Sequence, residues 1–129
     1  MYIVTAAAII RDGKVLIAQR QPGSHMEYMW EFPGGKLEPD ETPEECIIRE
    51  IKEEMDIDIQ VVDIYKVVKF KYEEKDILLL CYLCRIIKGD GKAIECNDFR
   101  WVTKDDLPGF DFVPADLPIV EKLINDKRL

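Results

Sequence analysis

Residues 35–57 read GKLEPDETPEECIIREIKEEMDI, and this segment organises the whole chain. It predicts a helix that begins after Thr42, because proline suits the first helical position and a Thr-x-x-Glu pair can form a capping box. The helix is expected to continue to about Met55. The residues predicted to face the core are Ile47, Ile48, Ile51 and Met55.

Three acids on this helix break the usual rules of charge placement. Glu50, Glu53 and Glu54 share an arc of about 100° on a helical wheel, beside the core face. Like charges four residues apart repel by roughly 0.2–0.5 kcal/mol, and acids near a helix C-terminus oppose its dipole by roughly 0.3–1 kcal/mol. Arg49 relieves only part of this. The pattern is typical either of a solvated acidic face or of a cation site, and an all-oxygen site favours Mg²⁺ or Mn²⁺ over zinc.

The acidity of the chain is concentrated in this same region. The 129 residues carry a formal net charge of −8, and residues 38–56 alone account for −7 of it. The overall charge disfavours nucleic-acid polymers and anionic membranes as partners, because both are polyanions. A divalent ion bound at the acidic segment would reverse its local effect on a phosphorylated substrate.

The remaining sequence predicts strands on both sides of the helix. Asp12-Gly13 favours a hairpin turn between the first two strands. Apolar or β-rich runs predict strands at 3–10, 15–20, 30–32, 58–72, 76–87 and 99–103, and a second helix is expected at 116–127. This order indicates a single domain over residues 1–129. Its class is α+β, an α/β/α sandwich with a mixed sheet between helices.

The cysteines and the N-terminus carry no signal for a metal site or a membrane. Cys81 and Cys84 form a C-x-x-C inside a predicted strand, where residues three apart point to opposite faces. We therefore expect buried, reduced thiols. The apolar run at the N-terminus is too short to span a bilayer and lacks a basic leader, so a cytoplasmic location is expected.

The spacing within residues 35–57 resembles the Nudix box, G-x₅-E-x₇-R-E-U-x-E-E-x-G-U, in which U is aliphatic. One position departs, because Asp56 replaces the late glycine, and Asp tolerates a positive φ better than most residues. Segments 19–20, 30–36, 101, 106–107 and 114–116 are similar to the MutT branch of the family, and the last of these looks more like bacterial CTP pyrophosphohydrolases. The matching box positions are Gly35, Glu41, Arg49, Glu50, Ile51, Glu53, Glu54 and Ile57.

This resemblance implies a fold and a reaction. It implies a Mg²⁺-dependent hydrolase, with Mn²⁺ as an alternative ion, that converts a nucleoside triphosphate and water into the monophosphate and pyrophosphate. Cytidine-type or modified and oxidised nucleotides are the implied substrates, as in sanitation of the nucleotide pool. The alternatives are an 8-oxo-dGTP diphosphatase of MutT type and a non-catalytic Nudix module that binds nucleotides. Either a monomer or a homodimer is compatible with the sequence.

The resemblance also assigns catalytic roles to individual residues. Either Glu53 or Glu54 would accept the proton of the attacking water, while Arg49 orients the carboxylates. Glu41 would anchor the loop to the helix. Glu95 would be a further catalytic carboxylate, or else a surface residue of its loop. The implied metal ligands are Glu50, Glu53, Glu54 and the backbone carbonyl of Gly35.

Substrate-binding roles follow in the same way. Asp116 would accept hydrogen bonds from the base, or else only cap the last helix. Arg20 and Lys36 would bring positive charge to the phosphates, and Phe32 would line the base pocket unless it is a core residue. The pair Gly34-Gly35 is expected to bend the loop sharply so that its backbone approaches a phosphate.

Overall fold

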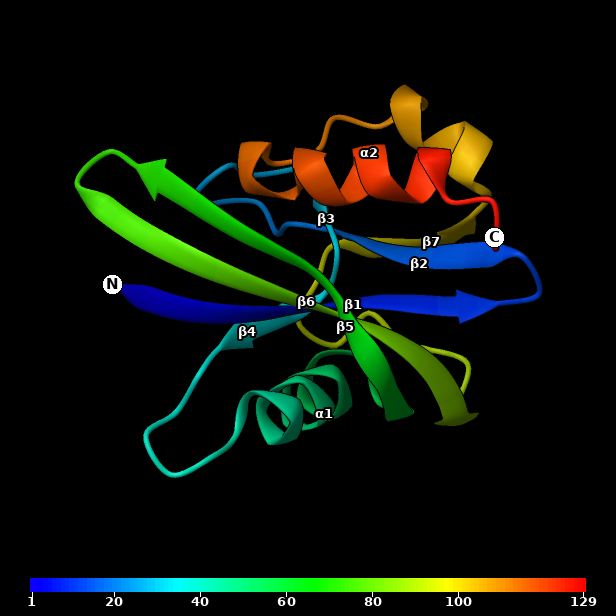
Figure 1. Ribbon diagram of the computed structural model, residues 1–129, viewed down its shortest axis with the longest axis horizontal. Coiled ribbons are helices and arrows are strands. Elements are labelled where there is room, and N and C mark those ends of the chain that lie inside the picture. The colour runs from blue at the N-terminus through cyan, green and yellow to red at the C-terminus, as the bar shows by residue number, and fades with distance from the viewer.

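The computed structural model describes residues 1–129 and is organised by one seven-stranded sheet (Figure 1). Two α-helices and two short 3₁₀ segments, Lys104–Gly109 and Pro114–Asp116, complete the chain. The strands are β1 Tyr2–Arg11, β2 Lys14–Gln19, β3 Trp30–Glu31, β4 Gly34–Lys36, β5 Asp58–Tyr72, β6 Lys75–Lys88 and β7 Asp98–Val102, and the helices are α1 Pro43–Met55 and α2 Leu117–Asn125.

The sheet is mixed, as the sequence predicted. Its main path is β3-β2-β1-β6-β5, with β4 added on β1 and β7 added on β2. Only β1 and β6 run parallel, and the other pairs are antiparallel. The β1–β2 hairpin turns at Asp12 and Gly13, both with positive φ, as the Asp-Gly signal indicated.

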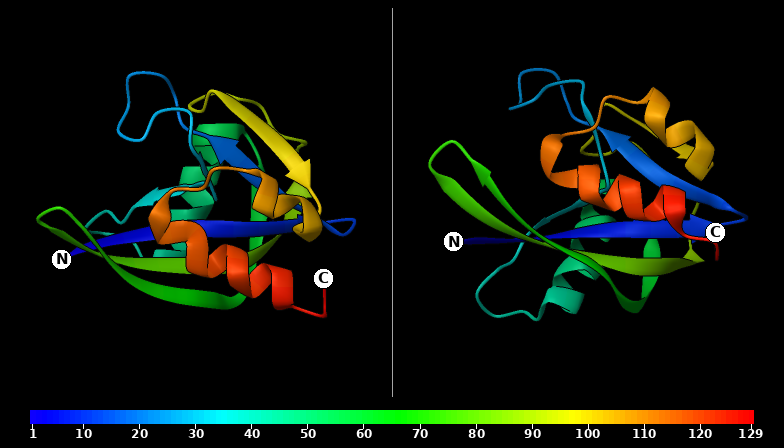
Figure 2. Two further views of the ribbon diagram at one scale, coloured as in Figure 1. Left: turned by 90° about the horizontal axis from the view of Figure 1, so that it is seen from above. Right: turned by 45° about the horizontal axis from the view of Figure 1, so that its top comes forward.

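Helices α1 and α2 cover opposite faces of the sheet (Figures 1 and 2). One apolar cluster joins α2 to its face, and a second joins α1 to the other face. Cys81 belongs to the first cluster and Cys84 to the second, so the C-x-x-C pair points in opposite directions, as expected. All four cysteines are free. The predicted α/β/α sandwich is confirmed.

Helix α1 begins as predicted and differs from the prediction on one face. Thr42 and Glu45 form the capping box, with N–H···O distances of 3.1 and 2.8 Å. Asp56 ends the helix in the left-handed conformation at φ 54°, so it takes over the role of the missing glycine. Ile48, predicted to face the core, is instead 41% exposed, because the sheet contacts a narrower stripe of the helix than the wheel suggested.

Strand β4 corrects the expectation of a sharp bend at Gly34-Gly35. Both glycines are extended, neither has a positive φ, and they pair with Ala6 and Thr5 of β1. Their lack of a side chain serves close approach rather than a turn. A Cβ on Gly34 would overlap the carbonyl oxygen of Thr5, and one on Gly35 would overlap the carboxyl group of Glu50.

The predicted second helix is also shorter than expected, since α2 begins at Leu117 and ends at Asn125. A 3₁₀ turn precedes it and carries Asp116. Neither helix is both long and apolar enough to cross a lipid bilayer.

Candidate active site

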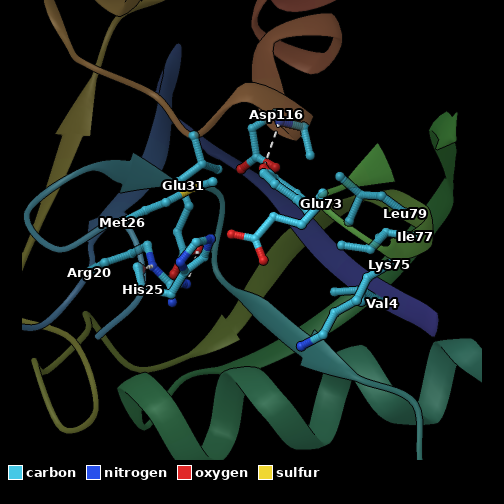
Figure 3. A pocket seen from close by; sticks show the side chains of 13 residues that line it. Val4, Arg20, His25, Met26, Glu31, Glu73, Lys75, Ile77, Leu79 and Asp116 are labelled. Carbon is cyan, nitrogen blue, oxygen red and sulfur yellow. Dashed lines mark hydrogen bonds and ion pairs between the residues drawn. The ribbon is translucent and has the colours of Figure 1, made fainter. Parts of the chain in front are cut away.

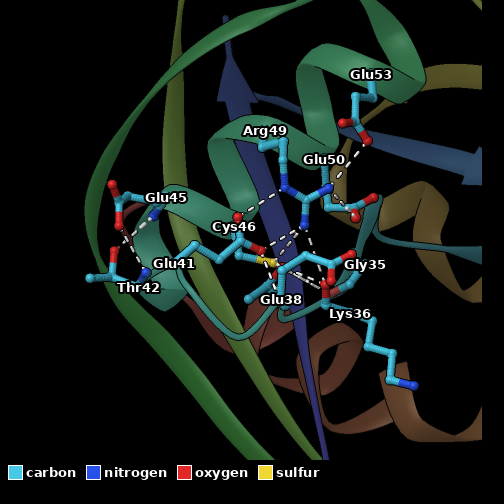
Figure 4. A network of polar contacts seen from close by, with 11 residues as sticks. Gly35, Lys36, Glu38, Glu41, Thr42, Glu45, Cys46, Arg49, Glu50 and Glu53 are labelled. Carbon is cyan, nitrogen blue, oxygen red and sulfur yellow. Dashed lines mark hydrogen bonds and ion pairs between the residues drawn. The ribbon is translucent and has the colours of Figure 1, made fainter.

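Arg49 is the centre of a polar network on the sheet side of α1 (Figure 4). Its Nε and Nη2 donate to the two carboxylate oxygens of Glu41, at 2.9 and 2.6 Å. Its Nη1 donates to Glu50 at 2.9 Å and to Glu53, one turn further on, at 3.2 Å. One guanidinium therefore fixes the carboxylates of three acids, through the planar geometry that suits Arg to this purpose.

Glu41 ties the loop before the helix to this network. The hydrogen bonds from Arg49 lower the pKa of Glu41 to about 2, so it is ionised throughout the neutral range. Its Oε1 also accepts the backbone N–H of Glu38 at 2.9 Å. The loop between β4 and α1 is thereby closed on itself and anchored to the helix.

Glu50 lies against the backbone of β4. Its side chain is 15% exposed, and it occupies the space that a Cβ on Gly35 would fill. Burial raises the pKa of Glu50, while Arg49 opposes that shift. The carbonyl oxygen of Gly35 accepts the hydroxyl of Thr5 at 3.1 Å, which holds this strand in place beside the helix.

Glu54 faces a different set of acids. The ion pairs of Arg49 go to Glu41, Glu50 and Glu53 and leave Glu54 out. Burial raises the pKa of Glu54 to about 9, and the negative charges of Glu31, Glu50 and Glu95 add to the shift. The helix thus presents a carboxyl group whose surroundings supply negative charge and no salt bridge.

The loop after β6 brings Glu95 to the same place. The backbone N–H groups of Ile94 and Glu95 both donate to the carbonyl oxygen of Glu54, at 3.1 and 3.2 Å. This satisfies a carbonyl at the end of α1 that the helix leaves free. A small pocket of about 190 Å³ results, lined by Arg20, Glu31, Glu54 and Glu95 among others.

These acids have the chemistry of a divalent-ion site without forming a closed cage. No three carboxyl, thiol or imidazole groups converge closely enough to hold an ion as they stand. The carboxyl groups of Glu31, Glu54 and Glu95 line this small pocket together with the thiol of Cys96, and their excess negative charge fits a hard cation such as Mg²⁺. Glu50, Glu53, Glu54 and Glu95 are the residues of this chain that could hold it, with Gly35 contributing its carbonyl.

A larger pocket of about 460 Å³ lies on the α2 side of β3 (Figure 3). Apolar side chains form much of its wall, and Asp116 lies among its lining residues. This carboxyl group is 5% exposed, and burial raises its pKa to about 8. Its Oδ2 accepts the backbone N–H of Phe32 at 2.8 Å. Asp116 occupies the N-cap position of α2, but its side chain makes no capping hydrogen bond there and accepts from Phe32 instead, so the expected side-chain cap is not formed.

The other predicted substrate residues lie in three different settings. Arg20 lines both pockets. Lys36 is exposed, and its ammonium lies 4.4 Å from the ring centre of Tyr2, directed away from the network of Arg49 (Figure 4). Phe32 is a core residue stacked on Phe112 at 5.3 Å and does not line the larger pocket, although its backbone N–H donates to Asp116, which does.

Sequence reasoning missed Glu31, which also lines both pockets. It forms an ion pair with Arg20 at 3.0 Å. The available signal was an acid between two large aromatics, Trp30 and Phe32, in a short strand. His25 and Tyr72, which line the larger pocket, were missed as well, and their rings pack edge to face with centroids 6.2 Å apart.

Comparisons with known proteins agree on one family. A family model described as a NUDIX domain matches residues 5–122. The CTP pyrophosphohydrolase of Escherichia coli (strain K12) is 34% identical over 121 residues, which cover 94% of this chain and 90% of that protein. The 8-oxo-dGTP diphosphatase of the same organism is 33% identical over 126 residues, covering 96% and 95%. The crystal structure of a MutT protein from Methanosarcina mazei Go1 aligns with a TM-score of 0.87 at 26% identity, over 99% of this chain and 96% of the other. The chain therefore belongs to the NUDIX domain family and is a Nudix hydrolase.

Proposed function

We propose that this protein hydrolyses a nucleoside triphosphate to the monophosphate and pyrophosphate in a Mg²⁺-dependent reaction. The observation that supports it is the junction of the two pockets, which share Arg20 and Glu31. One pocket has the size and apolar walls for a base, and the other is lined by Glu54 of α1 and by Glu95. A nucleotide can therefore extend from Asp116 towards Glu54.

The acids of α1 and the loop beside it would carry the reaction. Glu50, Glu53 and Glu54, with the Gly35 carbonyl, would hold the divalent ions, which when bound screen the phosphate charge and activate water. Glu53 or Glu54 accepts the proton of the attacking water, and Glu95 adds a further carboxylate.

Arg49 and Arg20 provide the positive charge of the site. Arg49 holds Glu50 and Glu53 in place through its hydrogen bonds. Arg20 lies at the junction of the two pockets, where its guanidinium can attract the phosphates of the substrate. Together they offset part of the repulsion between the acids and an anionic substrate.

Asp116 would recognise the base, and we propose cytidine-type nucleotides, including modified ones, as substrates. A carboxyl group can accept a hydrogen bond from cytosine N4, and the similarity to the E. coli CTP pyrophosphohydrolase favours this assignment. The same group could accept from guanine N1 and N2. The similarity to the E. coli 8-oxo-dGTP diphosphatase therefore supports oxidised guanine nucleotides as the second candidate.

The four free cysteines agree with a role in a reducing compartment such as the cytoplasm.

A nucleotide panel tests the reaction. The protein is incubated with Mg²⁺ and each of the common and oxidised nucleoside triphosphates, and pyrophosphate and phosphate are measured separately. We expect pyrophosphate with one base strongly preferred, and no turnover in EDTA. Phosphate without pyrophosphate would contradict the assigned bond. Binding of nucleotides without any turnover would instead support a non-catalytic module.

Replacing Asp116 by Ala should weaken discrimination between bases. Losing a buried hydrogen-bonding group typically costs 10-fold or more in preference, so the ratio of kcat/KM between the best and second-best base should fall by about 10-fold. The ratio is measured with both substrates in competition. An unchanged preference profile would remove Asp116 from base recognition.

Asp116 also predicts a pH dependence of folding. Its pKa is about 8 in the folded protein and about 3.9 when unfolded, so the folded state keeps a proton that the unfolded state releases. Stability therefore falls as pH rises from about 4 to about 8. In Asp116→Asn the neutral amide escapes this loss, and its stability relative to wild type should rise by at least about 1 kcal/mol between pH 5 and 8. Urea unfolding of both proteins without metal measures the difference, and parallel pH curves would contradict the prediction.

A further inference from the structure

Glu31 lies at the boundary between the two pockets. It belongs to the two-residue strand β3, and its side chain, 29% exposed, lines both of them. Its negative charge acts on Asp116 in one pocket and on Glu54 in the other, raising the pKa of each. The carboxyl group is thus within electrostatic reach of both ends of the site.

The position of Glu31 is fixed by Arg20. The guanidinium Nε of Arg20 donates to the carbonyl oxygen of His25 at 2.6 Å, and its Nη1 donates to Oε1 of Glu31 at 3.0 Å. These contacts use one oxygen of Glu31 and leave Oε2 without a hydrogen bond from the protein. A carboxylate has about four acceptor sites, so most of its capacity is free.

The chemistry of a nucleotide decides what can meet this free oxygen. In the binding mode proposed above, on which this inference depends, the base lies at Asp116 and the phosphates at the acids of α1. The sugar must then span the junction beside Glu31. A carboxylate repels phosphate, whereas it readily accepts hydrogen bonds from the hydroxyl groups of the sugar.

We propose that Glu31 is a specificity-determining residue that accepts a hydrogen bond from a hydroxyl of the substrate's sugar. Arg20 holds it in the orientation that meets the sugar, and the pair lets the enzyme recognise the sugar separately from the base. The rival role is purely positional, in which Glu31 does no more than orient Arg20 towards the phosphates.

A substrate-by-variant cycle separates these roles. The kcat/KM values of CTP and of its 2′-deoxy, 3′-deoxy and 2′,3′-dideoxy analogues are measured with wild type and Glu31→Ala; the GTP series replaces them if the panel ranks guanine first. We expect removal of the hydroxyls to lower the kcat/KM of wild type by about 10–100-fold, as for the loss of a hydrogen bond to a charged group. In Glu31→Ala the same removal should lower kcat/KM by less than about 3-fold. The two single-deoxy analogues identify the hydroxyl.

Two further variants guard against a trivial result. Glu31→Gln keeps the shape and one acceptor oxygen, so it should retain a reduced hydroxyl penalty even if Glu31→Ala folds poorly. Glu74→Ala removes a carboxyl group from the exposed turn beside the same pocket, which Glu74 does not line, and should keep the wild-type penalty. Thermal unfolding checks the fold of each protein.

The outcomes distinguish this inference from the proposed function. An equal hydroxyl penalty in wild type and Glu31→Ala overturns the inference in favour of the positional role, and so does the absence of any penalty in wild type. In both cases nucleotide hydrolysis, and with it the proposed function, stands. If no nucleotide is hydrolysed, the proposed function fails first. The same cycle is then measured as dissociation constants of the analogues, where equal values again overturn the inference.

Discussion

Glu54→Gln should lower the rate of nucleotide hydrolysis by at least 10²-fold while leaving the fold intact. Glu54 is the one acid of the helix cluster that Arg49 does not pair, and it lies within reach of the charges of Glu31, Glu50 and Glu95. A carboxylate placed there is suited to bind a cation or to accept the proton of water, and a positioned base typically contributes 10²–10⁴-fold. The amide has the same shape but supplies neither charge nor basicity.

The stability of the variant should move in the opposite direction to its activity. Because burial raises the pKa of Glu54 to about 9, ionisation of this group is unfavourable in the metal-free fold. A neutral amide should therefore unfold at the same or a higher denaturant concentration near pH 7. A loss of turnover without loss of stability would identify Glu54 as functional rather than structural.

Mg²⁺ provides a readout that does not depend on turnover. An ion that binds only the folded state stabilises it by mass action, by about 2.7 kcal/mol at 100 times its Kd. The Tm of wild type should rise with Mg²⁺, and that of Glu54→Gln should rise less. Glu44→Gln, on the exposed first turn of the same helix, is the matched control and should behave as wild type in both assays. Full activity in Glu54→Gln would exclude it from the mechanism.

The features that the sequence predicted best are those whose causes are local. The start of α1 follows from Thr42, Pro43 and Glu45, three neighbours whose capping geometry needs no tertiary contact. Asp56 could be assigned a positive φ for the same reason, since the end of a helix demands it. The spacing of the box residues indicated the family, and the family in turn implied the role of Arg49.

The features that were missed or wrong depend on distant contacts. Ile48 has the helical position of a core residue, and only the path of the sheet leaves it 41% exposed. Glu31 became visible as a candidate only when folding placed it between two pockets. Lys36 is the last residue of β4 and Phe32 directly follows β3, yet the side chain of Lys36 lies over the ring of Tyr2 and that of Phe32 is buried in the core. Sequence proximity to a motif does not fix the direction of a side chain.

The two glycines of β4 face different neighbours, a backbone carbonyl in one case and a side chain in the other, and substitution by alanine tests both contacts. In Gly34→Ala the new methyl group would overlap the carbonyl of Thr5, whose oxygen and carbon belong to the central strand β1 and cannot move alone. We expect a loss of about 3 kcal/mol or more in unfolding free energy, at the upper end of the usual cost of overpacking, and a fall in Tm of about 10 °C or more.

Gly35→Ala should behave differently although it is the next residue. Its methyl group would meet the carboxyl group of Glu50, which is the far end of a flexible side chain and can swing aside. The fold should then lose much less stability than in Gly34→Ala. The displaced Glu50 gives up its 2.9 Å hydrogen bond with Arg49 and its place beside β4, so turnover should fall by about 10²-fold.

Gly109→Ala completes the series, because a Cβ at Gly109 meets no atom within 4 Å and its φ needs no glycine. It should match wild type in both Tm and turnover. Each of the three variants differs from wild type by a single added methyl group. Their compositions and unfolded states are therefore nearly alike, and differences in their stability report the local contacts in the folded state. If Gly34→Ala were as stable as Gly109→Ala, the close pairing of β4 with β1 would be wrong. If Gly35→Ala kept full activity, the position of Glu50 against the backbone of β4 would have no part in the reaction.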